Sequence, residues 1–221
     1  MIKAIIFDAF GTLFKLESGG SARKIISNIT AYGNHIDEQA FIKEWKEYYK
    51  IHTAADMDFK TERDIFISRI SMFYNRYNVE RNAEIDADFL LVNSYERDVY
   101  EEVPSALKML NNKYKIYIGS NTDNDVLNAV MKKNNITVDK IYTSENLKCY
   151  KPNPEFYLAI LRDNNLSPHE AVFIGDSIDD DILGPQYIGI KSILIDRMQR
   201  YCTNSIADKV LNRVPSTLNI E

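Results

Sequence analysis

The segment IKAIIFDAFGTLF, residues 2–14, decides the fold. Its first half is a short run of β-branched and aromatic residues, which is typical of a buried strand. The run ends at Asp8, and Gly11 and Thr12 follow at once. In an open parallel sheet, ligands bind beyond the carboxyl ends of the strands. Asp8 is therefore a candidate for binding or catalysis, although a single Asp at a strand end more often caps a turn.

Apolar runs of the same kind recur later in the chain. They cover residues 114–121, 139–145, 171–176 and 191–196, and we expect a last short strand and a terminal helical turn within 207–220. Helical patterns separate these runs, one starting at Pro104, one over 123–135 and one over 153–165. Strands that alternate with helices of this length predict βαβ units. We therefore expect an α/β fold with a Rossmann-like parallel sheet core.

The stretch between the first two strands differs, because it shows only helical periodicity. Its apolar stripes are Ile25, Ile26, Ile29 and Tyr32; Phe41, Trp45 and Tyr48; Phe66, Ile70, Phe73 and Tyr77; and Ile85, Phe89 and Val92. Four amphipathic helices would form a small inserted bundle. The expected domains are a discontinuous core, residues 1–15 and 98–221, and a four-helix insertion, residues 16–97. We expect hinges at 15–20 and 97–103.

Composition narrows the class of protein. The 221 residues carry a net charge of −5 and no basic block, which argues against nucleic acid as a partner. The chain has two cysteines, Cys149 and Cys202, without a CxxC pattern, so we expect neither a disulfide framework nor a zinc site. No apolar stretch approaches the length of a membrane span. We expect a soluble cytoplasmic protein without a nucleic-acid or membrane partner.

Polar residues follow four of the predicted strands. Asp8 follows the first, Ser120 and Asn121 follow the second, Lys151 comes shortly after the third, and Asp176 follows the fourth. Each of these residues alone is weak evidence for a site. A lysine before proline, for example, is usually a solvated loop residue. Carboxylates, a hydroxyl–amide pair and an ammonium at successive strand ends together indicate a site for an anionic ligand.

These segments resemble the four motifs of the haloacid dehalogenase superfamily. The motifs are FDAFGTLF (7–14), IGSNTD (118–123), KPNPEFY (151–157) and GDSIDDDILGP (175–185), and their order and spacing cover almost the whole chain. The helical insertion resembles the type-1 cap of that family. The resemblance implies a hydrolase in which Asp8 attacks the substrate and forms a covalent aspartyl intermediate. It implies that the substrate anion is held by Lys151, Ser120, Asn121, Thr12 and the turn at Gly11.

The fourth motif carries a dense run of acids, Asp176 and residues 179–181. One interpretation is a helix N-terminus, where acids are favoured by the helix dipole. The other is a Mg²⁺ site, because Mg²⁺ prefers oxygen ligands. By resemblance to Mg²⁺-dependent members, the ligands would be Asp8, the backbone carbonyl of Phe10, Asp176, and either Asp180 or Asp181.

Phe10 stands where the family's phosphatases usually have a second Asp, which protonates the leaving group. General acid–base help of this kind contributes roughly 10²–10⁴ in rate. The family's L-2-haloacid dehalogenases lack that acid, because a halide leaves without a proton. The segment EWKEYY, 44–49, also resembles the dehalogenase segment that holds substrate, with Trp45 kept and Lys46 in place of its Arg. Tyr157 stands at the dehalogenase tyrosine position.

The acidic fourth motif and Phe10 in the first motif together indicate one expected function. The acidic motif favours Mg²⁺ as cofactor and a small phosphate ester or anhydride with a good leaving group as substrate. The alternatives are a metal-independent 2-haloacid dehalogenase and a catalytically weak binding protein. We expect the substrate to contact Phe10, Gly11, Phe14, Trp45, Lys46 and Tyr157. The expected partner is a small anionic substrate, and a homodimer through an exposed aromatic face of the insertion is a further option.

Overall fold

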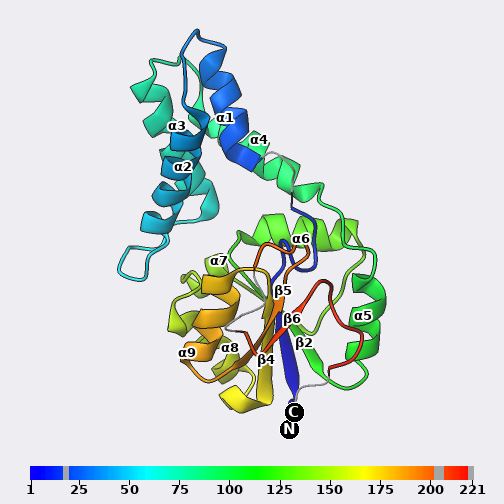
Figure 1. Cartoon of the computed structure of the whole chain (residues 1–221). Helices are drawn as coiled ribbons and strands as arrows, with labels where there is room; N and C mark the ends of the chain where they lie inside the picture. The colour runs from blue at the N-terminus through cyan, green and yellow to red at the C-terminus, as the bar shows by residue number, and fades with distance from the viewer. Residues whose placement is uncertain (17–19, 202–206, 219–221) are drawn as a thin grey trace. The chain divides into compact units, whose positions relative to one another are not determined.

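The computed structural model describes residues 1–16, 20–201 and 207–218. The chain divides into two compact units (Figure 1). One, here called the sheet unit, comprises residues 1–16 and 97–221, and the other, the helical unit, comprises residues 17–96. The predicted boundaries differ from these by one residue at each junction. The first predicted hinge, 15–20, includes residues 17–19, and Cys202 falls in 202–206; both segments lie outside the described residues.

The sheet unit contains a six-stranded sheet of parallel strands in the order β3-β2-β1-β4-β5-β6. The strands are β1 (Ala4–Phe7), β2 (Lys115–Ser120), β3 (Lys140–Thr143), β4 (Ala171–Gly175), β5 (Lys191–Ile195) and β6 (Lys209–Leu211). This confirms the predicted Rossmann-like parallel sheet. The expected terminal helical turn is absent from residues 212–218, and residues 219–220 are outside the described part.

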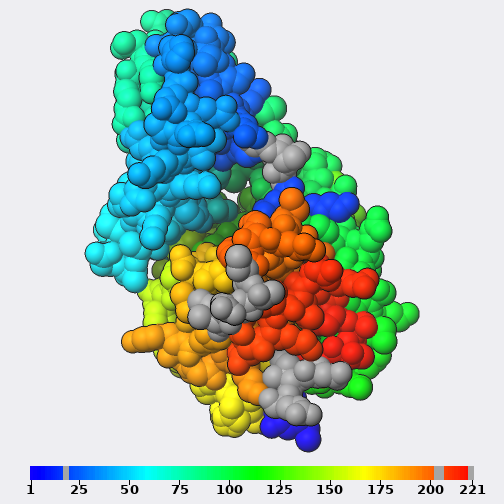
Figure 2. Space-filling model, in the orientation of Figure 1, coloured from blue at the N-terminus to red at the C-terminus, as the bar shows by residue number. Residues whose placement is uncertain are grey.

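Helices cover both faces of this sheet. They are α5 (Val103–Leu110), α6 (Asn124–Lys133), α7 (Ser144–Leu147), α8 (Pro154–Asp163) and α9 (Gly184–Tyr187), with a 3₁₀-helix, η1 (Pro168–Glu170), and a π-helix, η2 (Ile178–Leu183). Alternate residues of a strand point to opposite faces. Ile5 and Phe7 pack with α5 and α6, whereas Ala4 and Ile6 pack with α8. The C-terminal segment, red in Figure 2, adds the buried Val214 to the first of these layers.

The helical unit consists of α1 (Gly20–Thr30), α2 (Glu38–His52), α3 (Glu62–Arg76) and α4 (Ala83–Tyr95). The side chains of Asp37, Thr61 and Asn82 accept backbone hydrogen bonds at the starts of α2, α3 and α4, which fixes where these helices begin. The four predicted helices are therefore present. None of the described helices is long and apolar enough to cross a membrane.

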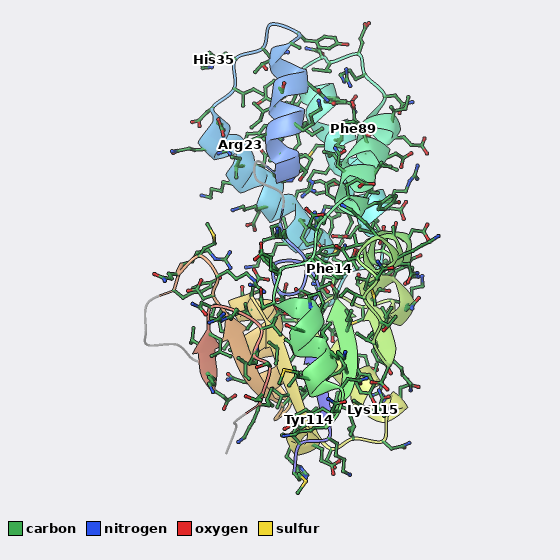
Figure 3. The ribbon with its side chains drawn as sticks, turned by 90° about the vertical axis from the view of Figure 1, so that its right-hand side faces the viewer. Phe14, Arg23, His35, Phe89, Tyr114 and Lys115 are labelled. Atoms are coloured by element: carbon green, nitrogen blue, oxygen red, sulfur yellow. The ribbon has the colours of Figure 1, made fainter. Side chains whose placement is uncertain are left out.

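The predicted apolar stripe of α4 is wrong. Ile85, Phe89 and Val92 are 65%, 48% and 52% exposed, and Phe89 is labelled in Figure 3. The buried residues are Asp86, Ala87, Leu90 and Leu91. Asp86 can be buried because the guanidinium of Arg81 and the hydroxyl of Tyr74 donate to its carboxylate. On the other three helices, each predicted stripe has at least two buried members, namely Ile25, Ile29, Phe41, Trp45, Ile70 and Phe73.

Candidate active site

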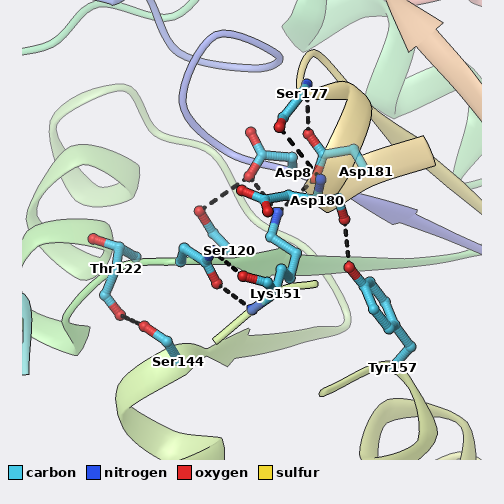
Figure 4. A network of polar contacts seen from close by, with 10 residues as sticks. Asp8, Ser120, Thr122, Ser144, Lys151, Tyr157, Ser177, Asp180 and Asp181 are labelled. Carbon is cyan, nitrogen blue, oxygen red and sulfur yellow. Dashed lines mark hydrogen bonds and ion pairs between the residues drawn. The ribbon is translucent and has the colours of Figure 1, made fainter. Parts of the chain in front are cut away.

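The core of the candidate site is a contact between residues at or after the carboxyl ends of β1, β2 and β3. Lys151 Nζ lies 2.8 Å from Asp8 Oδ1, and Ser120 Oγ donates to the same oxygen at 3.3 Å (Figure 4). Asp8 and Lys151 are 6% and 3% exposed, so the ion pair is buried. Among the described residues, none donates to Asp8 Oδ2. Parallel pairing of β1 with β2 places Asp8 and Ser120 at one edge of the sheet, as the strand-end rule predicts.

Two further carboxylates join Asp8. Asp8, Asp176 and Asp181 each offer an oxygen within 4.8 Å of the others. Asp181 Oδ1 accepts from Lys151 Nζ at 2.7 Å, and Asp181 Oδ2 accepts from the Ser177 backbone N–H at 2.9 Å. The side chain of Asp180 is not in this group. Asp181 reaches the group from η2, a π-helix, which is a form of helix that often occurs at functional sites.

The charges of this cluster do not balance without a cation. Burial raises the pKa of Asp181 to about 8. Burial, and then the nearby Asp8, raises the pKa of Asp176 to about 6. Burial opposes the charge of Lys151, but the carboxylates of Asp181 and Asp8 outweigh it and raise the pKa of the ammonium. The Lys151 ammonium, which pairs with Asp8 and Asp181, and the Arg200 guanidinium, which pairs with Asp176, thus face three carboxylates. An all-oxygen donor set with this excess of negative charge fits a hard cation such as Mg²⁺.

The loop after β1 packs directly on the acidic cluster. Gly11 has φ +94°, and a Cβ added there would lie 2.6 Å from the carboxylate of Asp176. Only glycine fits this close approach. Thr12 is completely buried, and its Oγ1 has no hydrogen-bond partner among the described residues. The ring of Phe10 lies next to the site, with the guanidinium carbon of Arg97 4.4 Å from its centroid.

Comparison with known proteins decides the family. The model of the haloacid dehalogenase-like hydrolases matches residues 2–189 of the chain. The chain belongs to this family. It is therefore an enzyme-family member, a hydrolase, as the four motifs predict.

Relatives of this hydrolase carry out two kinds of reaction. It is 25% identical to a glyceraldehyde 3-phosphate phosphatase of Pyrococcus furiosus, over 99% of this chain and 92% of the relative. It is 23% identical to (S)-2-haloacid dehalogenase 4A of Burkholderia cepacia, over 89% and 84%. Its fold also matches the Bacillus subtilis putative HAD-hydrolase YfnB, solved with magnesium, with a TM-score of 0.76, 14% identity and coverage of 96% and 95%.

Asn121 and Tyr157 make contacts other than those predicted. The amide of Asn121 donates to the Lys151 carbonyl at 3.0 Å and accepts from the Lys151 backbone N–H at 2.7 Å. It thus holds the main chain of Lys151, and this arrangement does not support the predicted donation to the substrate anion. Tyr157 is fully buried, and its hydroxyl donates to the Asp180 carbonyl. It therefore positions the acidic segment, and substrate contact is not supported.

The other predicted substrate contacts have different locations. Phe14 is 0% exposed in the core of the sheet unit, so it offers no surface to a substrate. Trp45 and Lys46 belong to α2 of the helical unit, where Trp45 is 5% exposed and Lys46 is exposed. Their contact with a substrate remains a prediction.

Two arginines near the site were missed. Arg200 Nη2 lies 3.1 Å from Asp176 Oδ2, and Arg197 Nη2 donates to the Thr12 carbonyl at 2.7 Å. Both follow β5, which ends at the same edge of the sheet as β1 and β4. The strand-end rule, applied to β5 as well as to the earlier strands, would have found them.

Proposed function

We propose that this haloacid dehalogenase-like hydrolase cleaves small phosphate esters or anhydrides with good leaving groups and depends on Mg²⁺. The observation that carries the proposal is the grouping of Asp8, Asp176 and Asp181 within 4.8 Å of one another, where three carboxylates outnumber the two cationic side chains that pair with them. A cluster of carboxylates that exceeds its counter-charges is suited to a divalent cation and the phosphate that it accompanies. The likeness to a glyceraldehyde 3-phosphate phosphatase supports the same class of substrate.

The chain's own residues account for two displacement steps. Lys151 and Ser120 hold Asp8 Oδ1. The other oxygen, Oδ2, forms a bond to phosphorus while the bond from phosphorus to the leaving oxygen breaks, and the leaving group takes the electron pair. Water then attacks phosphorus, and the aspartyl–phosphorus bond breaks to give inorganic phosphate and free Asp8. When bound to Asp8, Asp176, Asp181 and the Phe10 carbonyl, Mg²⁺ would neutralise charge on the phosphoryl oxygens.

Phe10 limits the leaving group in this proposal. A phenyl ring cannot give the leaving oxygen a proton, so the oxygen must depart as an anion. Acyl phosphates and aryl phosphates have leaving groups that are stable as anions. Alkyl phosphates do not, and we expect them to be poor substrates.

A second candidate is hydrolysis of a carbon–halogen bond. Phe10 favours it, because a halide leaves without a proton, and the likeness to a 2-haloacid dehalogenase adds support. In this reaction Asp8 would attack carbon and form an ester, from which water releases a hydroxy acid. The grouping of Asp176 and Asp181 with Asp8 has no use in that reaction, which is why we place it second.

The test is phosphate release from acetyl phosphate and p-nitrophenyl phosphate, with Mg²⁺ and with EDTA, for the wild-type chain and for Asp8→Asn. We expect Mg²⁺-dependent turnover that Asp8→Asn removes, with acetyl phosphate preferred. Turnover equal in the two proteins would come from a contaminant and would count against the proposal. In that case halide release from L-2-chloropropionate decides whether the second candidate holds.

A further inference from the structure

The helical unit contains a cavity of about 380 Å³. Its walls are mostly apolar and include Ile42, Trp45 and Tyr49, while Arg23, Lys46 and Arg69 supply positive charge. Arg23 is labelled in Figure 3. None of the described residues that line the cavity is acidic. Its volume falls within the range of roughly 300–1,000 Å³ that is usual for small-molecule sites.

Arg69 is the unusual residue of this cavity, because it is buried without forming an ion pair among the described residues. It is 2% exposed, and the carboxylate that acts on its charge, that of Glu62, does so without an ion pair at contact distance. Its guanidinium carbon lies 3.6 Å from the centroid of the Trp45 ring and 4.7 Å from that of Phe66. Burial lowers the pKa of the guanidinium to about 10, because it outweighs the opposing charges of Tyr49 and Glu62. The fold thus tolerates an unfavourable charge at this position.

The other arginines of the helical unit show what is missing at Arg69. Each of them forms an ion pair with a carboxylate: Arg23 with Glu38, Arg63 with Glu84 and Asp88, Arg76 with Glu44, and Arg81 with Asp86. A charge that is buried without a partner is strongly destabilising in a protein. Its presence at the wall of an open cavity is explained if a ligand supplies the negative charge.

The hydrogen bonds of Arg69 indicate how that ligand would bind. Nη1 donates to the Trp45 carbonyl at 2.8 Å, which fixes the plane of the guanidinium. Nε is buried without a hydrogen-bond partner among the described residues, and within that part of the chain Arg69 donates only through Nη1. Nε and Nη2 together form the edge of the guanidinium that binds a carboxylate or a phosphate in bidentate fashion.

We propose that this cavity binds a small organic anion with an apolar body, whose carboxylate or phosphate pairs with Nε and Nη2 of Arg69. Trp45, Tyr49 and Ile42 contact the apolar body of the anion. Lys46, exposed at the cavity, adds positive charge that attracts the ligand. The site lies within the helical unit, and the proposal does not depend on the chemistry of Asp8.

The test uses the full chain and the fluorescence of Trp45, which is the only tryptophan of the sequence. Hexanoate is the carboxylate probe, butyl phosphate is the phosphate probe, and hexan-1-ol is the neutral control; isothermal titration calorimetry measures the same affinities. We expect saturable binding of at least one anion and none of the alcohol. The ratio of the two anion affinities identifies the preferred head group.

Two variants of α3 separate Arg69 from general effects. Arg69→Met should weaken anion binding at least tenfold. Arg76→Met removes an arginine of the same helix whose partner is the exposed Glu44, and it should bind like the wild type. Asp8→Asn should also bind like the wild type, so that loss of catalysis and loss of this site are told apart.

A measurement on the wild-type chain covers the case in which Arg69→Met does not fold. The Nε–Hε resonance of Arg69 should shift on addition of the anion and not on addition of hexan-1-ol. Equal binding by wild type and Arg69→Met, or an unmoved Arg69 resonance at saturating anion, would overturn the proposal.

Discussion

The two units of this hydrolase both bury charge, but of opposite sign. In the sheet unit, the carboxylates of Asp8, Asp176 and Asp181 outnumber the two cations that pair with them, because Lys151 pairs with Asp8 and Asp181 and Arg200 pairs with Asp176. In the helical unit, Arg69 is buried and forms no ion pair with a carboxylate among the described residues. Each arrangement is unfavourable by itself, because removing a charge from water costs more than imperfect pairing returns.

A third buried charge shows the ordinary case. Asp86 in the helical unit is 6% exposed, and its carboxylate accepts hydrogen bonds from Arg81 and Tyr74. The Asp86 carboxylate is therefore neutralised by protein groups and requires no bound ligand or ion. Imbalance of buried charge, rather than burial itself, therefore distinguishes the two candidate sites from the structural ion pair, and the sign of the imbalance indicates a cation in one site and an anion in the other.

The largest effect is expected at Lys151. Replacing it by Met leaves Asp8 and Asp181 without their only counter-charge, and the substrate anion without its ammonium. We expect kcat to fall by about 10²–10³, as for loss of a charge-stabilising donor. The free energy of unfolding in EDTA should fall by about 3–5 kcal/mol, as for a broken buried ion pair. Steady-state kinetics and urea denaturation measure the two effects; unchanged stability would contradict the assigned imbalance.

Phe10→Asp tests the limit on leaving groups. An acid at this position can protonate a leaving alkoxide, which is worth roughly 10²–10⁴ in rate. We expect kcat/KM for an alkyl phosphate to rise by about 10² relative to that for acetyl phosphate, which needs no proton. Phe10→Asn, which has the same shape and no acid, is the control. A gain of the same size in both variants would indicate altered packing of the ring and not acid catalysis.

The pH dependence of stability reports on the acidic cluster. Asp176 and Asp181 have pKa values of about 6 and about 8, raised by burial above those of the unfolded chain. Between about pH 4 and 8 the folded metal-free chain therefore binds more protons than the unfolded chain. For this reason these two carboxyl groups make the free energy of unfolding fall as the pH rises.

Mg²⁺ should reverse this loss, because it competes with the protons. At about 100 times Kd it adds about 2.7 kcal/mol, which corresponds to about 5–10 °C in Tm for a chain of this size. Thermal unfolding should show a larger Mg²⁺ shift at pH 8 than at pH 5, and NaCl of equal ionic strength is the control. An equal shift at both pH values would argue against binding by these carboxylates.

The smallest effect is expected in the helical unit. Arg69→Met removes an unpaired charge and should leave the free energy of unfolding within about 1 kcal/mol of the wild type, or raise it. Asp86→Asn breaks a satisfied pair and should lower the free energy of unfolding by about 1–3 kcal/mol. Urea denaturation of both variants tests the comparison; the reverse order would mean that Arg69 has only a structural role.

Much of the fold follows from the sequence, because periodicity and strand-end positions are local signals. The six strands, the four inserted helices, and the meeting of Asp8, Ser120 and Lys151 were predictable in this way. The choice between Asp180 and Asp181 was not. It depends on the winding of η2, since a π-helix shifts which offset from Asp176 faces the site, and spacing alone does not reveal the winding.

The wrong prediction for α4 and the missed Arg69 have a common cause, namely contacts with residues of other helices that local sequence patterns do not reveal. The helix α4 has two apolar sides, either of which could face the core of the helical unit. The side that carries Asp86 is the buried one, because Arg81 and Tyr74 donate hydrogen bonds to the Asp86 carboxylate. Arg69 was missed because an arginine on a helix is usually exposed. Its position was nevertheless a signal, since it lies four residues after Ile65 and four before Phe73, both of which are buried.

The central place of β1 in the sheet has a consequence for synthesis of the chain. Ala4 pairs with Lys115 on one side and with Ala171 on the other. This strand therefore has no neighbouring strand until residues 115–120 have been made, whereas the helices of the helical unit pack with one another. Contacts so distant in sequence are slow to form. The nascent apolar segment of residues 2–7 is thus the part of this hydrolase most exposed to aggregation and to chaperones.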